Sequence, residues 1–593
     1  MFLLHKKKER DKIKNYHPIT LLNSDYKLQT KAMTNRLGKC VDNVIRPDQA
    51  GFVAVRDILD HIKLAKVVKE YCDTEEVNRC LFALHQEKAY DRIDHTYLWK
   101  ILKAFKVPSP FLGMGDPLSC LLFDLAIELL AESLRRSNLK GIEIPGAVSR
   151  LLVRLFAEDT QVYLSKADKR TDVTNITDKW CLAWTAKFNT GKTEFLPMGS
   201  AEYRRDMARR KCLQPNRIRS AEVLLRGWRI VKDTEPIRIL GGQVGHKLDV
   251  EAIWEPVTAK IESLANKWSA KRMTLRGKRL IVAFLLQSRA QYLMMTNDPP
   301  KSVVDRIAKA THRVMWERKR RGLTKIAILE CPVAEGGQGV PDFRARVATA
   351  RLMWLRKWCL PEDRRPLWAA IVDVLIRNAA NLLKSDPKQA ISSTLTQEWR
   401  EKIGRTSKLS AELQTMLAEG RKVNVRIEGL KFNKRLRGDM PIWLSKVTDL
   451  TPKDEKTAAM KQLREHHRVL TMKDLKRVKY QNTKGCKRHL KCMMCIDLIT
   501  IKTAPRANIR FQTPMLEGAE APDGLDHTAH CKKQVLLDLK AGAEVLLNPD
   551  VTERESIAGS TRIFGLIPAK NLRTGKGLQW TKRQCFNSTQ TDW

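Results

Sequence analysis

The spacing of apolar residues predicts short strands in the first part of this chain. Cys80–Leu84 is a short apolar run of the kind that forms a buried strand. Leu151–Phe156 and Gln161–Leu164 are two further strand-like runs, and the intervening residues 157–160 are few enough for a hairpin. Ser119–Arg136 instead has its apolar residues at helical spacing, which predicts an amphipathic helix.

From Glu251 onward, helical spacing dominates. We expect tryptophans of this region, such as Trp254 and Trp316, to pack in helical cores. The pattern therefore predicts a mixed α/β front half and a mostly helical back half. The expected helices are Ile253–Trp268, Lys278–Met294, Val303–Trp316 and Val347–Trp358.

The charge of the chain indicates a polyanionic partner. Lys and Arg total 109 and Asp and Glu total 66, which leaves a formal net charge of +43. The best apolar run, Cys120–Ala131, is broken by Asp124 and Glu128, and no segment approaches the roughly 18 apolar residues of a membrane-spanning helix. Nucleic acid is therefore favoured over a membrane. The basic residues are densest at Lys6–Lys14, Arg204–Lys232 and Arg313–Lys325.

Cysteine usage and the start of the chain bear on location. The 13 cysteines are scattered, which argues against a disulfide scaffold. Met1–Leu4 is too short for the apolar core of a signal peptide. We expect the nucleus or the cytoplasm.

Two adjacent acids, Glu158 and Asp159, lie at the tip of the predicted hairpin. An ordinary polar turn is one interpretation, but acids this close repel each other unless a cation lies between them. Two-metal nucleotidyl transfer needs carboxylates from at least two strands. A second candidate strand leads into Leu84–His95, and Gly115–Ala126 is a glycine-led loop that enters a helix.

This order of segments resembles the palm of a reverse transcriptase, and closely resembles the non-LTR (LINE-type) retrotransposon polymerases of fungi. The resemblance is strongest over residues 15–250. It implies an α/β (α+β) right-hand polymerase-like fold with fingers, palm and thumb, followed by a mostly helical C-terminal region. The further blocks that carry it are Asn15–Leu37, Asp48–Val53, Cys181–Glu194 and Arg238–Gly245.

The resemblance also implies a division of the chain. The expected parts are a fingers-like segment (1–79), a palm-like core (80–250), a thumb-like helical region (251–330), a helical region (331–470) and a partly disordered Cys/His-containing region (471–593).

The activity implied by the family is RNA-directed DNA polymerisation with Mg²⁺, an RNA template, a DNA primer or target, and deoxynucleoside triphosphates. The resemblance places Glu158 and Asp159 at the metal, Lys192 near the triphosphate, and His85 where the family has a metal-binding aspartate. The other positions that match nucleotide-binding or nucleic-acid-binding motifs are Gly115, Asp116, Pro117, Leu118, Ser119, Tyr90, Lys27 and Arg36.

The chain departs from the family pattern where the chemistry is most demanding. Mg²⁺ prefers oxygen ligands, whereas the imidazole of His85 suits softer metals. Glu158 replaces a family aspartate, and its extra methylene moves the carboxylate by about 1 Å, which can cost on the order of 100-fold in rate. Met114 and a shortened link from Phe111 to Gly115 are further departures.

These departures predict a degenerate active site in which polymerisation is lost. A non-catalytic RNA- or DNA-binding remnant is the alternative to an enzyme, and Glu87 is the carboxylate that would substitute for the missing aspartate. A degenerate element copy and a clipped gene model both explain the pattern. No block resembles the endonuclease that usually precedes this polymerase, so we expect a truncated N-terminal part.

A Cys/His cluster near the C-terminus has two interpretations. Buried thiols on a helix are one, and a zinc site is the other, because zinc-knuckle-like clusters occur in this part of non-LTR elements. One zinc ion would use Cys492 and Cys495 with two of His527, His530 and Cys531. We predict His527 and Cys531 as the other two ligands.

Overall fold

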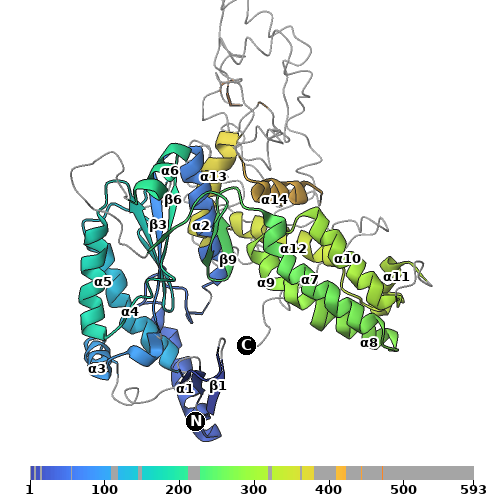
Figure 1. Cartoon of the computed structure of the whole chain (residues 1–593), viewed down its shortest axis with the longest axis horizontal. Coiled ribbons are helices and arrows are strands. Elements are labelled where there is room, and N and C mark those ends of the chain that lie inside the picture. Colours follow the sequence, from blue (N-terminus) through green and yellow to red (C-terminus); the bar gives the residue numbers. More distant parts are fainter. Residues whose placement is uncertain are drawn as a thin grey trace, which may run out of the picture. The chain divides into compact units, whose positions relative to one another are not determined.

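A computed structural model describes most of the first 379 residues and little beyond them. The chain divides into two compact units, Met1–Ile253 and Trp254–Trp593, which can be followed by colour along the chain in Figure 1. The described residues are 2–5, 9–13, 16–19, 21–54, 56–87, 89–107, 118–144, 150–211, 228–317, 324–360, 364–379, 409–422, 443, 470–471 and 474.

The first unit is built on a sheet with the strand order β4-β5-β3-β6-β7. The central strand β3 (Arg79–His85) is antiparallel to both β5 (Asp159–Ser165) and β6 (Glu194–Met198). β4 (Val153–Phe156) pairs with β5, and β7 (Arg229–Ile230) runs parallel to β6. The strands predicted near residues 80, 153 and 162 are thus confirmed.

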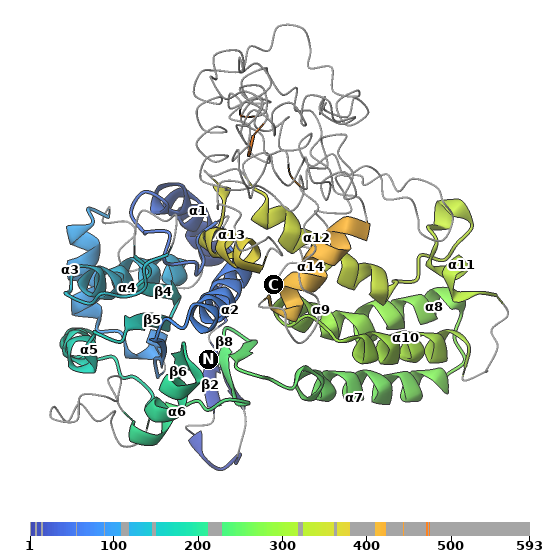
Figure 2. The same ribbon diagram turned by 90° about the horizontal axis from the view of Figure 1, so that it is seen from above.

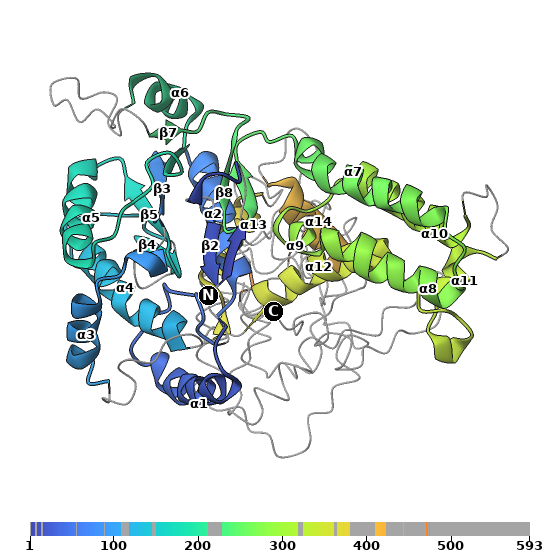
Figure 3. The same ribbon diagram turned by 60° about the horizontal axis from the view of Figure 1, so that its bottom comes forward.

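Helices cover both faces of this sheet. Helices α3 (His95–Ala104), α4 (Ser119–Arg135) and α5 (Arg170–Trp184) lie on one side, and α2 (Ile58–Thr74) lies on the other (Figure 1, Figure 3). The remaining elements of the unit are β1 (Phe2–His5), β2 (Tyr16–Ile19), α1 (Ser24–Val41), a 3₁₀ turn (Ala89–Arg92), α6 (Ala201–Arg210), β8 (Pro236–Ile239) and β9 (Gly242–Gly245).

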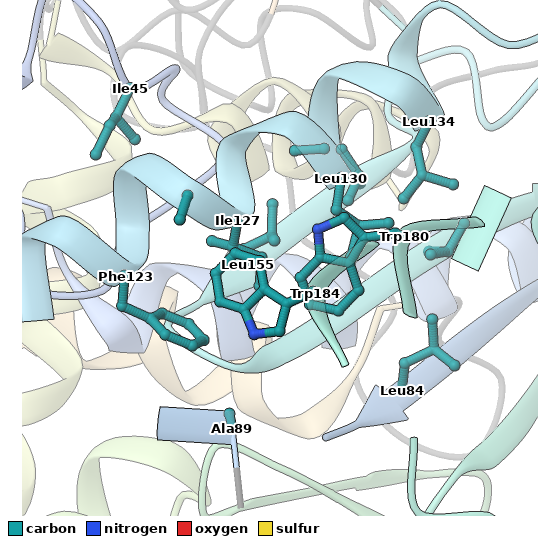
Figure 4. Packing of buried hydrophobic residues seen from close by; sticks show 14 of the residues in the cluster. Ile45, Leu84, Ala89, Phe123, Ile127, Leu130, Leu134, Leu155, Trp180 and Trp184 are labelled. Carbon is teal, nitrogen blue, oxygen red and sulfur yellow. The ribbon is translucent and has the colours of Figure 1, made fainter. Parts of the chain in front are cut away.

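Burial on both faces explains why β3 is continuously apolar. Alternate side chains of a strand point to opposite faces. Phe82 and Leu84 belong to the core formed with α4 and α5, where Phe123 and Trp184 also lie (Figure 4). Leu81, which points the other way, is fully buried as well. A strand covered on both sides has no polar face, so its sequence does not alternate.

The second unit is helical, and the predicted helices there are confirmed with one exception. The sequence predicts one α-helix over Lys278–Met294, but the structure has a π-helical segment within it, Ile281–Gln287. Figure 2 labels the α-helices on either side of this segment, α8 and α9. Trp254 and Trp316 are buried, as expected. No helix among the described residues is both long and apolar enough to cross a membrane. The helices are α7 (Val250–Ser269), α8 (Leu275–Leu280), α9 (Ser288–Thr296), α10 (Lys301–Met315), α11 (Ile326–Glu330), α12 (Phe343–Trp358), α13 (Leu367–Ala379) and α14 (Ala411–Lys422).

A buried histidine ties the β8–β9 hairpin to the sheet. His246 follows β9 directly, and its side chain is only 3% exposed. Its Nδ1 lies 2.9 Å from Oδ2 of Asp73, and its Nε2 lies 2.7 Å from the carbonyl oxygen of Pro197. Both ring nitrogens therefore lie at hydrogen-bonding distance from oxygen atoms. Asp73 is on α2 and Pro197 is on β6, so one side chain joins three elements.

The surroundings of Asp73 favour its ionised form. Burial alone would raise the pKa of this carboxyl, but the hydrogen bond from His246, the charge of Lys69 and the N–H of Gly199 outweigh burial, and the pKa of Asp73 is lowered. The ion pair is thus maintained to acid pH.

We expect His246→Phe to lower the free energy of unfolding by about 2–3 kcal/mol, because it removes hydrogen bonds that involve a charged group. The measurement is urea unfolding of the full chain. Lys69→Gln is the control, because it removes a partly exposed ion pair of 3.3 Å and should cost less than about 1 kcal/mol. Equal losses in the two variants would contradict this account.

The same pair predicts an acid dependence. Since the folded-state pKa of Asp73 is lowered, its contribution is present above the ordinary carboxyl pKa of about 4 and is lost as pH falls through the folded value. Asp73→Asn should flatten this loss in an acid titration of unfolding.

Candidate functional site

The hairpin that carries the two adjacent acids has a tighter turn than the sequence indicates. Ala157 and Glu158 form the turn, and Asp159 is already the first residue of β5, opposite both Phe156 and His85. The prediction that residues 157–160 separate the strands is therefore wrong at its C-terminal side, because pairing with β3 extends β5 to Asp159. Of the two acids, only Glu158 lies in the turn.

A segment of the chain that is distant in sequence supports this turn. The Oε1 of Gln49 accepts hydrogen bonds from the N–H of Ala157 at 3.0 Å and from the N–H of Gly51 at 2.8 Å. A Cβ on Gly51 would lie 2.5 Å from the nitrogen of Ala157, so only glycine fits there. Asp48 is held by Arg135 of α4 at 2.9 Å. The block Asp48–Val53 thus packs against the hairpin turn and supports it.

Three side chains meet where β3 ends. Nδ1 of His85 lies 2.7 Å from Oδ1 of Asp159, and Nζ of Lys192 lies 3.3 Å from Nε2 of His85. The Lys192 ammonium can only donate, so Nε2 accepts and Nδ1–H donates to the Asp159 carboxylate. We call this series of contacts the Lys192–His85–Asp159 chain.

The backbone before β6 fixes the place of Lys192. The N–H of Asn189 donates to the carbonyl of His85 at 2.8 Å. The N–H of Lys192 in turn donates to the Asn189 carbonyl at 3.1 Å. This turn brings Lys192 to the end of β3, where its side chain contacts His85. Asn189 is not singled out by the sequence, since its role depends on this contact.

A second acidic group lies deeper. Asp124 of α4 is fully buried, and neither of its carboxylate oxygens has a hydrogen-bond partner among the described residues. Burial, together with the charges of Glu128 and Glu158, raises the pKa of Asp124 to about 8, against the opposing charge of Arg56. The sequence signal for this site was an acid inside the apolar run of a helix.

Tyr90 lies beside this buried acid. Its side chain is 38% exposed, and its ring centroid is 4.5 Å from that of Phe123. Burial and the nearby charges of Cys120, Glu158 and Asp124 raise the pKa of Tyr90. Glu158 therefore acts electrostatically on the groups around Tyr90, while Asp159 bonds to His85.

The other predicted residues are dispersed or lie outside the described residues. Leu118 is buried at the start of α4, which begins at Ser119, and Lys27 and Arg36 are exposed on α1. Glu87 forms an ion pair of 3.7 Å with Arg92. Gly115, Asp116, Pro117, Met114, Cys492, Cys495, His527 and Cys531 lie outside the described residues.

These residues do not fit a pair of Mg²⁺ ions. Two-metal chemistry needs carboxylates that converge from separate strands, but β3 ends in an imidazole, and that ring bonds to the carboxylate of Asp159. No group of three or more His, Cys, Asp or Glu side chains within the described part of the chain is arranged to hold a metal ion.

We expect Asp124→Asn to remove a pH dependence of stability. Because the folded-state pKa of Asp124 is raised to about 8, its contribution is present below the ordinary carboxyl pKa of about 4 and is lost as pH rises through about 8. The nearly isosteric amide cannot ionise, so the free energy of unfolding should decline less from pH 5 to 9. Asp178→Asn, at an exposed position, is the control and should leave the decline unchanged. A parental slope retained in Asp124→Asn would show that another group causes it.

Comparisons with known proteins agree with the resemblance. Residues 4–244 match the family described as reverse transcriptase (RNA-dependent DNA polymerase). The chain is also 25% identical over 414 residues to a protein of Xenopus laevis named transposon TX1 uncharacterized 149 kDa protein. That match covers 64% of this chain but 30% of the Xenopus protein, so the chain spans less than a third of its relative. The chain thus contains a region, residues 4–244, that matches the reverse transcriptase domain, and it is similar to a transposon protein.

Proposed function

We propose that this chain derives from the reverse transcriptase of a non-LTR (LINE-type) retrotransposon, that it binds RNA and DNA in the nucleus or cytoplasm, and that it no longer polymerises DNA. The Lys192–His85–Asp159 chain is the observation that carries the proposal. An imidazole and an ammonium group lie at the end of β3, and the resemblance assigns position 85 to a metal-binding carboxylate.

The loss of polymerisation follows from the chemistry of phosphoryl transfer. Metal ions lower the barrier by neutralising charge on the transferred group and activating the nucleophile. The acids that remain at the hairpin are Glu158 and Asp159, and Asp159 is engaged by His85. A site in which one of two carboxylates bonds to an imidazole, with an ammonium group next to that ring, is a poor site for two divalent cations.

Binding of nucleic acid is supported by the distribution of charge. The excess of basic residues, +43 overall, would release counterions from a phosphate backbone. Residues 263–297 of the second unit contain no Asp or Glu, and they expose five cations together with Phe284, which is 71% exposed. We assign this segment, within the thumb-like region 251–330, to the nucleic-acid-binding surface. Its exposed cations are Lys267, Lys271, Arg272, Arg276 and Arg289.

We expect affinity for RNA–DNA duplex to fall steeply with salt and to depend little on base sequence, because interactions with phosphates carry no sequence information. The triple change Lys271→Gln, Arg272→Gln and Arg276→Gln should reduce the slope of log affinity against log salt by about 1 for each cation that pairs with a phosphate in the parent. The measurement is filter binding by the full chain at several salt concentrations.

The matched control for this triple change lies on a surface of mixed charge. Lys166→Gln, Lys169→Gln and Lys179→Gln alter three exposed lysines close in sequence to Asp172 and Asp178. The control should keep most of the parental slope. A salt-independent affinity, or an equal reduction of slope in both triple variants, would refute the assigned surface.

We expect no deoxynucleotide incorporation by the parental chain on a primed RNA template with Mg²⁺. The double variant His85→Asp, Glu158→Asp should not reach full activity, because the residues of a catalytic unit act non-additively and other departures remain. Single reversions should be nearly as inactive as the parent. Template-dependent incorporation by the parent would show that polymerisation is retained, and the proposal would fail.

A further inference from the structure

The ammonium group of Lys192 supplies a positive charge at the end of β3. We propose that Lys192 and His85 take the place of a divalent metal ion at this site: they compensate the charge of Asp159, so that the strand end is stable without metal and does not take up Mg²⁺ or Mn²⁺. This inference deepens the proposed function, because both rest on the replacement of a carboxylate at position 85.

Strand register creates the need for a cation. His85 and Asp159 are directly opposite each other in the antiparallel pair of β3 and β5. Side chains at such positions have Cβ atoms about 4.5–5.5 Å apart. An aspartate at position 85 would therefore face the Asp159 carboxylate at close range, and the two would repel each other unless a cation bridged them.

The imidazole of His85 removes this repulsion without a metal ion. Its Nδ1–H donates to Asp159 at 2.7 Å, and its Nε2 accepts from the Lys192 ammonium at 3.3 Å. The positive charge of Lys192 thus reaches the carboxylate through a polarised ring. A metal ion would compete for the same oxygen of Asp159 and would meet the ammonium group as a like charge.

The position of Lys192 is built into the fold. Asn189 bonds to the carbonyl of His85 at 2.8 Å, and the N–H of Lys192 bonds both to the Asn189 carbonyl at 3.1 Å and to its side-chain Oδ1 at 3.2 Å. The lysine therefore starts from a backbone anchored to the residue whose ring it contacts. A lysine on a loop without these backbone hydrogen bonds would lack that constraint.

The neighbouring acid in the sequence, Glu158, is not part of a metal site among the described residues. Glu158 lies in the turn, and its charge acts on Asp124 and Tyr90. Within the described residues, the acids around the hairpin are thus not gathered into a group that could hold a metal ion.

The test uses the full chain, with Mn²⁺ as the probe. Binding is followed by loss of the free-ion signal in electron paramagnetic resonance, and stability by the Tm with and without metal. Asp159→Asn should not reduce the Mn²⁺ binding of the parent, because the parent has no Mn²⁺ site at Asp159. Mn²⁺ should not raise the Tm of the parent. His85→Asp should lower the Tm without metal and create a site, with Mn²⁺ raising its Tm by about 5 °C at 100 times the dissociation constant.

Further variants distinguish the effect of the carboxylate at position 85 from the effect of the Lys192 ammonium group. His85→Asn is close in size to His85→Asp but adds no charge, so it should show no response to Mn²⁺. His85→Asp combined with Lys192→Met should bind Mn²⁺ more tightly than His85→Asp, since the competing ammonium group is gone. Lys192→Met alone should lower the parental Tm and, because the carboxylate pair is absent, create no site.

Two outcomes would overturn the inference. One is Mn²⁺ binding by the parent that depends on Asp159, and the other is a Lys192→Met variant as stable as the parent. Either could occur in a chain that binds nucleic acid and fails to extend a primer, in which case the proposed function would stand. Primer extension by the parent would refute the proposed function, whatever the result with Mn²⁺.

Discussion

The pairing of β3 with both β5 and β6 is the constraint on which the rest of the first unit depends. β3 lies at the centre of the sheet, and its side chains are buried on both faces. Its register with β5 puts the last residue, His85, opposite Asp159. The same strand anchors the turn before β6 through the carbonyl of His85. Shifting this register by one residue would move every side chain of β3 to the opposite face, so the core and the candidate site are determined together.

Imidazole rings contact the carboxylates of Asp73 and Asp159 in this unit, and the two arrangements differ. At Asp73 the ring of His246 is buried, and its two nitrogens lie against oxygen atoms of Asp73 and Pro197. At Asp159 the ring of His85 has one nitrogen on the carboxylate and one on Lys192, so the charge comes from the lysine. The first arrangement joins three elements of the fold, and the second stabilises a strand end in the region that matches the reverse transcriptase domain.

The strands and helices that could be predicted are those whose burial follows the spacing of apolar residues along the chain. The runs around Cys80–Leu84 and Ser119–Arg136, and the helices α7, α10 and α12 of the second unit, were found from their periodicity because burial of a strand or helix face depends on neighbouring residues along the chain. The sequence also singled out position 85 as a candidate site residue, through the family motif that it resembles. The π-helical segment Ile281–Gln287 was not, because its hydrogen-bond pattern leaves no clear mark on apolar spacing.

By itself, the sequence determined the strands around residues 80, 153 and 162, several helices and the excess of positive charge, and its resemblance to a family motif singled out His85. Only the tertiary structure decided what that histidine does. Its partner Asp159 is 74 residues away and Lys192 is 107 residues away, and neither distance along the chain indicates a contact. The turn at Ala157 and the support from Gln49 were hidden for the same reason. Spacing reports which face of an element is buried, whereas the identity of a polar partner depends on strand register and on loops that meet only after folding.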